Sequence, residues 1–340
     1  MGVQLHSVNP TDDDAIDAYH RIVAASWACD LPDFPTLTRD QVAAMIRHPF
    51  PSKDRYYFIV RRSGEVVGAV EIALPTADNH HLAEVELSVH PDRRRRGIGR
   101  ETFAELVQFA REHGRALLVA EYCVSLKSGP ERSAAPAAFA ESVGAKPALP
   151  EVRRRLDLAT VDPDDWRARY EDALAQAKGY SPVWWSGPAP DDVAADVAYL
   201  EGRMVGDAPM GELRYEPENY DAARIQATDE TFLRRGTDAY NAGVRDDETG
   251  RLVGWSAIHF EVGETTHAWQ GTTIIDPNHR GHRLGLLVKL ENLIRVREVQ
   301  PALRYVDTWN AEENTHMIAI NEAIGFRPVD GWVACQYDVP

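Results

Sequence analysis

A long internal repeat constrains the fold of this chain more than any other feature. Residues 62–74 read RSGEVVGAVEIAL, and residues 248–260 read ETGRLVGWSAIHF. Gly68 in the first segment aligns with Gly254 in the second, an offset of 186 residues.

A second pair of segments keeps the same offset. Residues 89–99 read VHPDRRRRGIG, and residues 275–285 read IDPNHRGHRLG. Chance matches would not hold one offset through both pairs. A repeat of such long period indicates two copies of one domain rather than a solenoid.

The length agrees with two copies. A chain of 340 residues has room for two domains of about 150–170 residues. Its hydrophobic content of 44% and charged content of 26% are those of an ordinary globular protein, so each half can bury a core. We expect an N-terminal domain at 1–160, a connecting helix at 161–180 and a C-terminal domain at 181–340.

Several protein classes are disfavoured. No apolar run approaches the ~20 residues of a membrane span, and the N-terminal segment MGVQLHSVNPTDDD lacks a basic and apolar signal. We therefore expect a cytoplasmic protein with no membrane partner. The three cysteines show no metal-ligand spacing, so we expect no metal site.

The net charge of −16 disfavours nucleic acid as a partner, because phosphate binding needs a basic face. An acidic surface attracts cations and is compatible with a positively charged amine substrate. For the assembly state we expect a monomer or homodimer.

The pattern of apolar residues predicts the same order of elements in both halves. Each half has helices, a hairpin, a long strand, a helix after an Arg- and Gly-bearing turn, and then strand, helix and strand. In the first half the strands are expected at 4–8, 56–61, 66–74, 83–89, 116–121 and 152–158. In the second half they are expected at 239–245, 252–260, 267–275, 303–308 and 333–338, and a further strand begins near 183–185. Hairpins mixed with strand–helix–strand units predict an α+β fold, with a mixed, mostly antiparallel twisted sheet flanked by helices.

The Arg- and Gly-bearing turn is a candidate anion site in both halves. A helix start leaves four backbone N–H groups unpaired and carries the positive end of the helix dipole. Gly97 and Gly99 let the backbone approach a ligand closely, and Arg94–Arg96 add charge-assisted donors. Residues 280–285, RGHRLG, are the equivalent segment. Such a turn can hold a pyrophosphate.

Two common nucleotide motifs are absent from the turn. It contains no Gly-Lys-Ser/Thr of a Walker loop and no GxGxxG dinucleotide turn. ATP and NAD are therefore poor candidates for its ligand.

The pattern V-x-P-x-x-R-x-x-G-x-G after a strand resembles the acetyl-CoA loop of the GNAT acetyltransferase superfamily. The first copy matches at every position of the pattern: Val89, Pro91, Arg94, Gly97 and Gly99. The second copy matches with Ile275, Pro277, Arg280 and Gly285, but Arg283 replaces the first glycine. The resemblance covers the whole chain as a tandem pair of GNAT-like domains, an architecture similar to that of the mycothiol synthases.

Further residues of the second half also resemble the family. Thr308-Trp309-Asn310, Asn314 and Ile324-Gly325-Phe326 are similar to the strand and helix that flank the acetyl group and pantetheine. The first half keeps only Phe139 and Gly144 of that segment.

The resemblance implies acetyl-CoA as cofactor and a set of residues that bind it. In the first half these are Val89, Arg94, Arg95, Arg96, Gly97, Ile98, Gly99 and Arg100. In the second half they are Ile275, Arg280, Gly281, His282, Arg283, Leu284, Gly285, Asn310 and Asn314.

Acetyl transfer to an amine needs a base, a donor for the thioester oxygen and an acid or donor for the departing thiolate. By the resemblance the oxyanion N–H lies near Val89 or Ile275. The strand before the loop often carries the base. Glu84 and Glu86 occupy it in the first half, whereas the aligned Gln270 and Thr272 cannot act as bases.

Other groups near the second loop strand are Glu261, His259 and His267. The usual tyrosine acid is missing in both halves, where Asn321 and roughly Ala140 take its place. The candidate catalytic residues are therefore Glu84, Ile275 and Asn314. Each also has a structural interpretation: Glu84 and Glu86 as solvated strand residues, and Asn314 as a helix N-cap.

The leading hypothesis is an acetyl-CoA-dependent N-acetyltransferase acting on a primary amine of a small molecule or peptide. This hypothesis allows one half to be non-catalytic, and it favours the second half as the active one. A non-catalytic acyl-CoA sensor or scaffold is the alternative, because the tyrosine is absent from both halves. A nucleic-acid-binding protein that uses Arg93–Arg96 is a third hypothesis, which the net charge disfavours.

Overall fold

The structure is a computed structural model that describes residues 2–340. By its internal contacts the chain forms two compact units. Unit 1 comprises Met1–Glu151, Met210–Glu216 and Asp330–Pro340, and unit 2 comprises Val152–Pro209 and Pro217–Val329.

Unit 1 has strands in the order β1-β2-β3-β4-β5-β12. Neighbours are antiparallel except the parallel pair β4 and β5. The strands are β1 (Gln4–Ser7), β2 (Lys53–Arg62), β3 (Glu65–Pro75), β4 (Leu82–Val89), β5 (Leu117–Ser125) and β12 (Arg327–Asp338). The helices are α1 (Asp13–Asp30), α2 (Arg39–Arg47), α3 (Ile98–Glu112) and α4 (Ala135–Val143), and a short 3-10 turn η1 (Pro91–Arg93) precedes α3.

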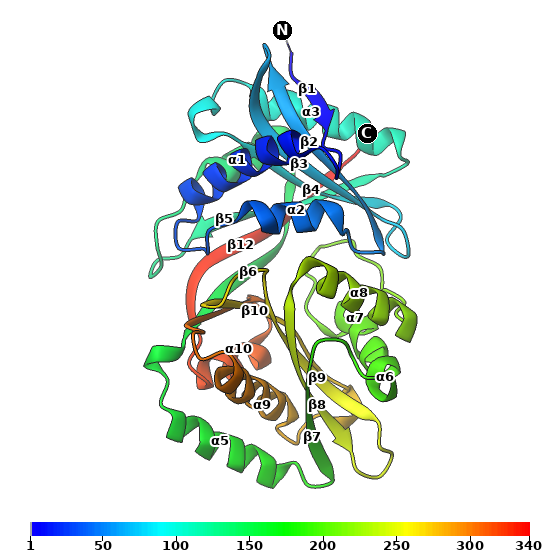
Figure 1. The fold of residues 1–340 in the computed structure, drawn as a ribbon, viewed down its shortest axis with the longest axis vertical. Helices are drawn as coiled ribbons and strands as arrows, with labels where there is room; N and C mark the ends of the chain where they lie inside the picture. Colours follow the sequence, from blue (N-terminus) through cyan, green and yellow to red (C-terminus); the bar gives the residue numbers. More distant parts are fainter. Residues whose placement is uncertain (1) are drawn as a thin grey trace. The chain divides into compact units, whose positions relative to one another are not determined.

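The sheet of unit 1 is buried on both faces. Ile59 packs with α1 and α2, and the adjacent Val60 packs with α3, because successive side chains of a strand point to opposite faces. Helix α2 begins at a capping box between Thr38 and Gln41. The result is a sheet with α1 and α2 over one face and α3 over the other (Figure 1).

Unit 2 has strands in the order β6-β11-β10-β9-β8-β7. The strands are β6 (Lys146–Asp157), β7 (Tyr180–Ser186), β8 (Asp238–Asp246), β9 (Leu252–Phe260), β10 (His267–Ile275) and β11 (Tyr305–Ala311). The helices are α5 (Pro163–Gln176), α6 (Asp191–Gly202), α7 (Met204–Asp207), α8 (Ala222–Arg235), α9 (Leu284–Val299) and α10 (Thr315–Ala323). Two 3-10 turns, η2 (Leu158–Thr160) and η3 (Pro277–His279), complete it. The core lies between the sheet and α9 on one face and between the sheet and α6 with α8 on the other.

The two terminal strands are exchanged relative to the sequence-based expectation. We expected 152–158 to close the first half and 333–338 to close the second. In the structure β12 pairs with β5 from Asp330↔Ser125 to Asp338↔Leu117, and β6 lies next to β11. The segment 161–180 also differs from a linker, because α5 packs on α9 within unit 2. The units are therefore interleaved along the chain, where the sequence predicted contiguous halves.

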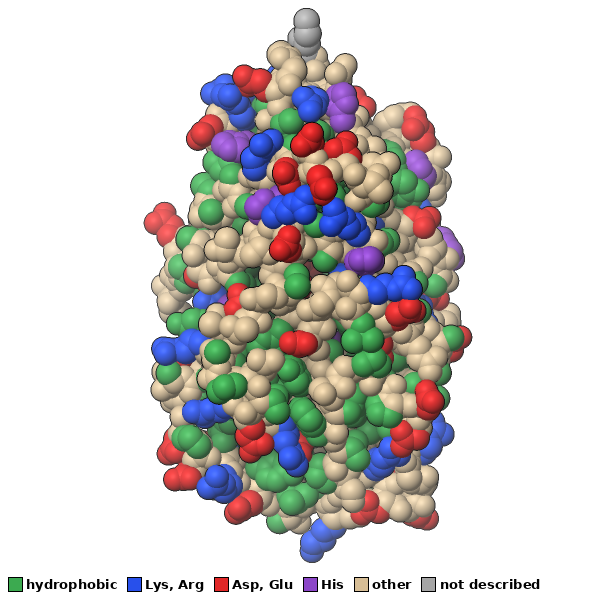
Figure 2. Space-filling view, viewed as in Figure 1, with side chains coloured by type: hydrophobic (Ala, Val, Ile, Leu, Met, Phe, Trp, Pro, Cys, Tyr) green, Lys and Arg blue, Asp and Glu red, His purple; other side chains and the backbone are tan. Residues whose placement is uncertain are grey.

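The α+β architecture of both units agrees with the sequence-based prediction. On the face drawn in Figure 2, acidic and basic side chains are interspersed. Among the helices formed by residues 2–340, none has the length and apolar character to cross a bilayer.

Candidate functional site

The two Arg- and Gly-bearing loops share the same backbone conformation, although the arginine and the glycine at the two left-handed positions have changed places. In unit 1, Arg95 (φ 62°) and Gly97 (φ 82°) adopt left-handed conformations. In unit 2 the aligned residues Gly281 (φ 92°) and Arg283 (φ 57°) do the same. The arginine that replaces the first family glycine in unit 2 therefore keeps the shape of the loop.

Each loop presents a row of free backbone donors. Within residues 2–340, the N–H groups of residues 95–100 have no protein acceptor, and Glu101 is the first residue to donate back into the helix, to the Gly97 carbonyl. The N–H groups of 281–286 are likewise free, and Leu287 donates to the Arg283 carbonyl. Six consecutive N–H groups at the positive end of a helix form a site for a phosphate or pyrophosphate.

The arginines at the matching positions of the two loops, Arg94 and Arg280, donate their hydrogen bonds to other groups of the protein. Arg94 donates to the two Asp30 carboxylate oxygens (both 2.7 Å), to Ser26 Oγ (2.8 Å) and to the Val89 carbonyl (3.0 Å). The Asp30 hydrogen bonds raise the pKa of Arg94 above its ordinary value. Arg94 thus ties its loop to α1.

Arg280 makes the equivalent contacts more weakly. It donates to the Ile275 carbonyl (3.2 Å) and to Asp207 (3.1 Å), and its side chain is 51% exposed, against 25% for Arg94. In both units the arginine bonds back to the strand that precedes its loop and to a carboxylate of a helix.

Exposed cations remain beside the donors. Arg95, Arg96 and Arg100 are exposed, and none of them forms an ion pair with another described residue. In unit 2, Arg283 pairs with Asp172 of α5, and His282 stacks at a tilt against Tyr180. Unit 1 therefore offers more free positive charge at its loop than unit 2 does.

The strand before each loop separates from its parallel neighbour. β4 and β5 pair only from Leu82↔Leu117 to Glu84↔Val119. β10 and β11 pair only from His267↔Tyr305 to Trp269↔Asp307. Beyond these three pairs each strand runs on toward its loop with one edge unpaired by its parallel neighbour.

Backbone donors face these open edges. His90 N–H donates to Val67 of β3, and Asp276 N–H donates to Val253 of β9. Because N–H groups along a strand alternate in direction, those of Val89 and Ile275 point the other way, to the open edge. The N–H of Thr273, two residues before Ile275, points there as well.

The helices close to each loop approach one another at a glycine. A Cβ on Gly99 would lie 3.1 Å from the Phe139 ring of α4, and a Cβ on Gly285 would lie 3.2 Å from Ile320 of α10. In both units a larger residue would push apart the two helices that flank the loop.

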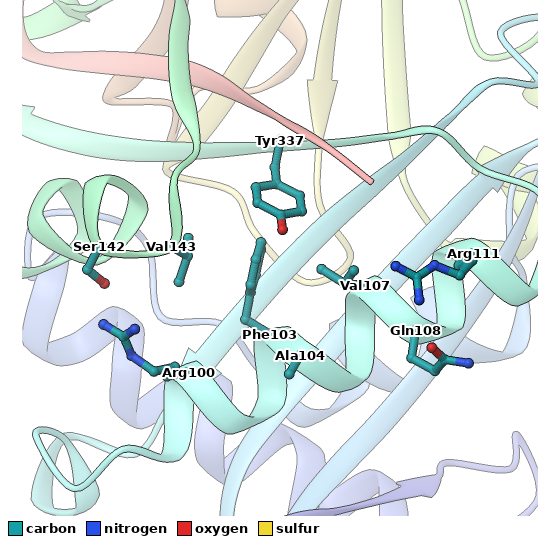
Figure 3. Close-up of a pocket in the computed structure, with 9 residues that line it drawn as sticks. All are labelled: Arg100, Phe103, Ala104, Val107, Gln108, Arg111, Ser142, Val143 and Tyr337. Atoms are coloured by element: carbon teal, nitrogen blue, oxygen red, sulfur yellow. The ribbon is translucent and has the colours of Figure 1, made fainter. Parts of the chain in front are cut away.

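A groove of about 340 Å³ runs along α3 in unit 1, starting at Arg100 beside the loop. In Figure 3 the rings of Phe103 and Tyr337 lie next to each other, in edge-to-face contact with their centroids 5.0 Å apart. Arg111 at its far end donates to the Pro340 carbonyl.

The acids on β4 differ in their surroundings. Glu84 accepts from Lys53 Nζ at 2.6 and 2.7 Å and from the Tyr215 hydroxyl at 3.1 Å. Glu86 reaches solvent, yet the surrounding protein and the nearby Glu71 raise its pKa to about 7. Glu86 and Glu71 line a small cavity of about 50 Å³ between β3, β4, α1 and α2. Of the two β4 acids, Glu84 is thus neutralised by an ion pair, and Glu86 is poised near neutral pH.

The matching strand of unit 2 carries a bulge. The register of β10 against β9 shifts between Gln270 and Thr273, whereas β3 and β4 pair without a shift. Gln270 is buried and donates to the Ala257 carbonyl (2.6 Å) and to Ser256 Oγ (3.2 Å). The bulge places Gly271 and Thr272 out of the regular ladder.

The other titratable groups that the sequence suggested near the second loop strand are packed against other parts of the protein. Burial lowers the pKa of His259 to about 4, and this ring stacks on Phe232. Burial raises the pKa of Glu261. His267 lies 3.1 Å from Asp307, in a buried network with Arg153 and Arg155.

Glu201 of α6 is a group that sequence reasoning missed. The protein around it raises its pKa to about 7, although the Thr272 hydroxyl acts as a hydrogen-bond donor to it. Its Oε2 atom is buried without a hydrogen-bond partner. A signal was present, since Glu201 follows Val193 and Val197 at four-residue spacing and so lies on the buried stripe of α6.

The asparagines of unit 2 form a small hydrogen-bonded group. Asn314 accepts from Met317 N–H (3.2 Å) and caps α10. Asn321, at the position where the family has its tyrosine, is fully buried and donates to Asn310 (2.7 Å). The Asn321 Oδ1 atom has no partner among the described residues.

Comparison with known proteins agrees with this geometry. The model of the Acetyltransferase (GNAT) family matches residues 19–124. The solved structure of a tandem GNAT protein from the clavulanic acid biosynthesis pathway is 32% identical, with a TM-score of 0.82, and covers 99% of both chains. The chain belongs to the GNAT acetyltransferase family. It is an acyltransferase of two GNAT units.

More distant GNAT structures share the fold over the whole chain. A GCN5-related N-acetyltransferase from Sphaerobacter thermophilus is 16% identical, with a TM-score of 0.66, over 99% of this chain and 96% of its own. A putative acetyltransferase from Pyrococcus horikoshii is 15% identical, with a TM-score of 0.57, over 99% and 90%. No curated protein matches the chain.

GNAT enzymes generally use acetyl-CoA, and both loops fit its pyrophosphate. The fit rests on the six free N–H groups of each loop. The open edges beside Val89 and Ile275 give an extended pantetheine arm a place to lie.

Proposed function

We propose that the protein is an acetyl-CoA-dependent N-acetyltransferase that acetylates a primary amine of a small molecule or peptide by direct attack on the thioester. The observation that supports it most is the row of six free N–H groups at a helix start beside a strand edge left open by its parallel neighbour. Family membership alone does not require these features to be intact, and they occur in both units.

Different residues of each unit contact different parts of acetyl-CoA in this proposal. In unit 1 the N–H groups of residues 95–100 hold the pyrophosphate, with the exposed Arg95, Arg96 and Arg100 beside it. In unit 2 the N–H groups of 281–286 do so, and Asn310 and Asn314 lie along the path of the pantetheine. Bound there, acetyl-CoA supplies the activated acyl carbon: the amine forms the C–N bond as the C–S bond breaks, and the amine proton and thiolate need an acceptor and a donor.

We place the chemistry in unit 2. The Ile275 N–H points to the open edge, where it can hold the thioester oxygen. The Thr273 N–H points to the same edge, because N–H groups alternate in direction along the strand. In unit 1 the candidate Glu84 is held in an ion pair with Lys53, so it is a weaker candidate base.

The acceptor is the finer part of the proposal. The tandem GNAT relative comes from the clavulanic acid biosynthesis pathway, which produces a small molecule. This relative favours a small-molecule amine over a peptide.

Two measurements test the proposal. Isothermal titration with acetyl-CoA should approach two sites per chain. CoA release, followed with a thiol reagent, should depend on a primary amine in a panel of lysine, arginine methyl ester, spermidine and glucosamine. A chain that binds no CoA would overturn the proposal.

A non-catalytic acyl-CoA sensor is the second candidate, favoured by one observation. The family tyrosine is replaced by Asn321, which is buried and occupied with Asn310. Two-site binding without amine-dependent CoA release across a broad panel would support the sensor.

A further inference from the structure

In each unit a hydrogen bond to a carboxylate links a helix to the strand before the loop, but the carboxylate comes from opposite elements. Glu86 lies on β4, and a Trp27 hydrogen bond from α1 reaches it. In unit 2 the aligned strand residue is Thr272, and the carboxylate is Glu201 on α6. In unit 1 the helix supplies the donor and the strand supplies the carboxylate, whereas in unit 2 the strand supplies the donor and the helix supplies the carboxylate.

Glu201 lacks the partners that a structural carboxylate normally has. Its Oε2 atom is buried with no hydrogen-bond donor, and no cation within residues 2–340 forms an ion pair with it. Buried carboxylates are ordinarily paired or hydrogen-bonded, because an unpaired one costs free energy. The Oε2 atom of Glu201 therefore keeps an unused capacity to accept a hydrogen bond.

Glu201 also contacts the strand along which acyl transfer is expected. Thr272 is part of the β10 bulge and is adjacent to Thr273, whose N–H faces the open edge. Ile275 is three residues further, about 10 Å along the strand at ~3.3 Å per residue. Helix α6 packs on β9 and β10, so Glu201 faces the strand that holds these donors.

From this arrangement we infer that Glu201 is the carboxylate that receives the ammonium group of the acceptor in unit 2 and takes its proton before attack. The inference rests on the proposed N-acetyltransferase function and deepens it. One proton passes from the ammonium nitrogen to Glu201, and the neutral amine then attacks the acyl carbon. As the C–N bond forms and the C–S bond breaks, the departing thiolate takes a second proton from the same nitrogen, which leaves the amide and CoA as its thiol.

The charges around Glu201 suit a base that works near neutrality. Glu218 is the nearby acid, and it disfavours a second negative charge. Arg224 is the nearby cation, but it is held by Glu218 (3.6 Å) and lies over the Tyr220 ring (3.8 Å). On β9, His259 is neutral because burial lowers its pKa to about 4. These groups leave the Glu201 carboxylate with a pKa of about 7, in the range where a general base is most effective.

The test uses the full-length protein and a matched pair of glutamates. Glu201→Gln should lower kcat/KM for the best amine of the panel by about 10²–10⁴-fold. It should also abolish the fall of kcat/KM below pH 7 while leaving acetyl-CoA affinity unchanged. Glu230→Gln, an exposed acid of α8 that pairs with Arg234, should change none of these quantities.

A second variant separates a base from a structural group. Thr272→Val removes the donor that favours ionised Glu201, so the acidic limb of the pH profile should move to higher pH and remain present. A limb that stays in place in this variant, or that persists in Glu201→Gln, would overturn the inference.

A spectroscopic measurement keeps the inference testable if no amine of the panel turns over. The infrared difference between wild type and Glu201→Gln should show a neutral carboxylic acid at pH 6 that is lost by pH 8. Saturating spermidine, as a cationic probe, should shift this titration to lower pH. A titration in the ordinary acidic range that spermidine leaves unmoved overturns the role of Glu201. A titration near 7 that spermidine shifts, with no turnover of any amine, supports that role and counts against the proposed function instead.

Discussion

The two loops of this protein achieve one backbone shape with opposite residues. Unit 1 has an arginine and then a glycine at its two left-handed positions, and unit 2 has a glycine and then an arginine. Both loops leave six consecutive N–H groups free. The comparison predicts that any anion binding by these loops is carried by the backbone, since the two units exchange the side chains at these positions.

The closed ends of the two strand pairs differ much more. In unit 1, Val119 at the last pair belongs to a small apolar cluster with Leu82 and Leu117. In unit 2 the last pair contains Asp307, which is fully buried with Arg153 and Arg155. At the point where the two parallel strands separate, unit 1 has apolar contacts and unit 2 has buried ion pairs.

The largest expected effect tests this second difference. Asp307→Ala removes the buried carboxylate that Arg153 and Arg155 share, and it should cost about 3–5 kcal/mol of unfolding free energy. Val119→Ala in unit 1 removes only apolar contacts and should cost roughly 2 kcal/mol. Urea unfolding measures both; equal costs would mean that the charges do not distinguish the units.

The same variant has a pH signature. The Arg155 hydrogen bonds hold the pKa of Asp307 below its ordinary value despite burial. A depressed carboxyl pKa stabilises the folded state above the unfolded value of about 3.9, and this contribution is lost as the pH falls further. The gap between wild type and Asp307→Ala should therefore shrink below about pH 4, whereas that of Val119→Ala should not.

The next effect decides which unit performs the chemistry. Removal of an oxyanion or positioning donor typically costs ~2.7–4 kcal/mol in the transition state. Asn314→Ala should therefore slow turnover far more than it weakens acetyl-CoA binding.

The control for Asn314 is a serine, which can still cap α10 but has no amide N–H. If Asn314→Ser restores turnover, the side chain acts only as a helix cap. A large loss with Glu84→Gln together with a harmless Asn314→Ala would move the active site to unit 1.

A smaller effect compares the two loop arginines. Arg94→Ala removes charge-assisted hydrogen bonds to Asp30 and should weaken acetyl-CoA in unit 1 by roughly tenfold to a hundredfold. Arg280 is more exposed and makes longer contacts, so its loss should cost unit 2 less than about tenfold.

Asp30→Asn shows how Arg94 acts. If the arginine works by fixing the loop on α1, this variant should weaken acetyl-CoA in unit 1 too. Tighter binding in Asp30→Asn would mean that the released guanidinium contacts the phosphates itself.

The sequence predicted the local elements well, because each has a local cause. The strands β9 and β10 have the bounds expected from apolar periodicity, and α9 is the helix expected after the Arg- and Gly-bearing turn. The repeat and the family pattern likewise led to the tandem GNAT fold. These features depend on neighbours within a few residues or on the direct alignment of the two halves.

What the sequence did not predict depends on partners far along the chain. The pattern of 333–338 identifies a strand, but it does not say that β5 is its neighbour. Glu201 resembles any helical acid until Thr272 is placed beside it. Arg94 was expected to face the phosphates, and only the fold brings Asp30 within 2.7 Å of it.

The smallest expected effect returns to the exchanged loop residues. Arg283→Gly relieves a left-handed conformation that costs an ordinary residue about 1–2 kcal/mol, and it removes an exposed ion pair with Asp172 worth about 0–1 kcal/mol. The unfolding free energy should therefore rise by between about 0 and 2 kcal/mol. The reverse exchange, Gly97→Arg in unit 1, should lower it by a similar amount.

Acetyl-CoA affinity is the sharper readout of this pair. If the backbone alone carries anion binding, Arg283→Gly should leave the affinity of unit 2 within about threefold, because the six N–H groups and their directions are unchanged. A loss of more than about tenfold, or about 1.4 kcal/mol, would show that the Arg283 guanidinium leaves Asp172 to bind the pyrophosphate. The two loops would then share a shape but not a mechanism, and the glycine missing from unit 2 would mark a site that binds through its side chain.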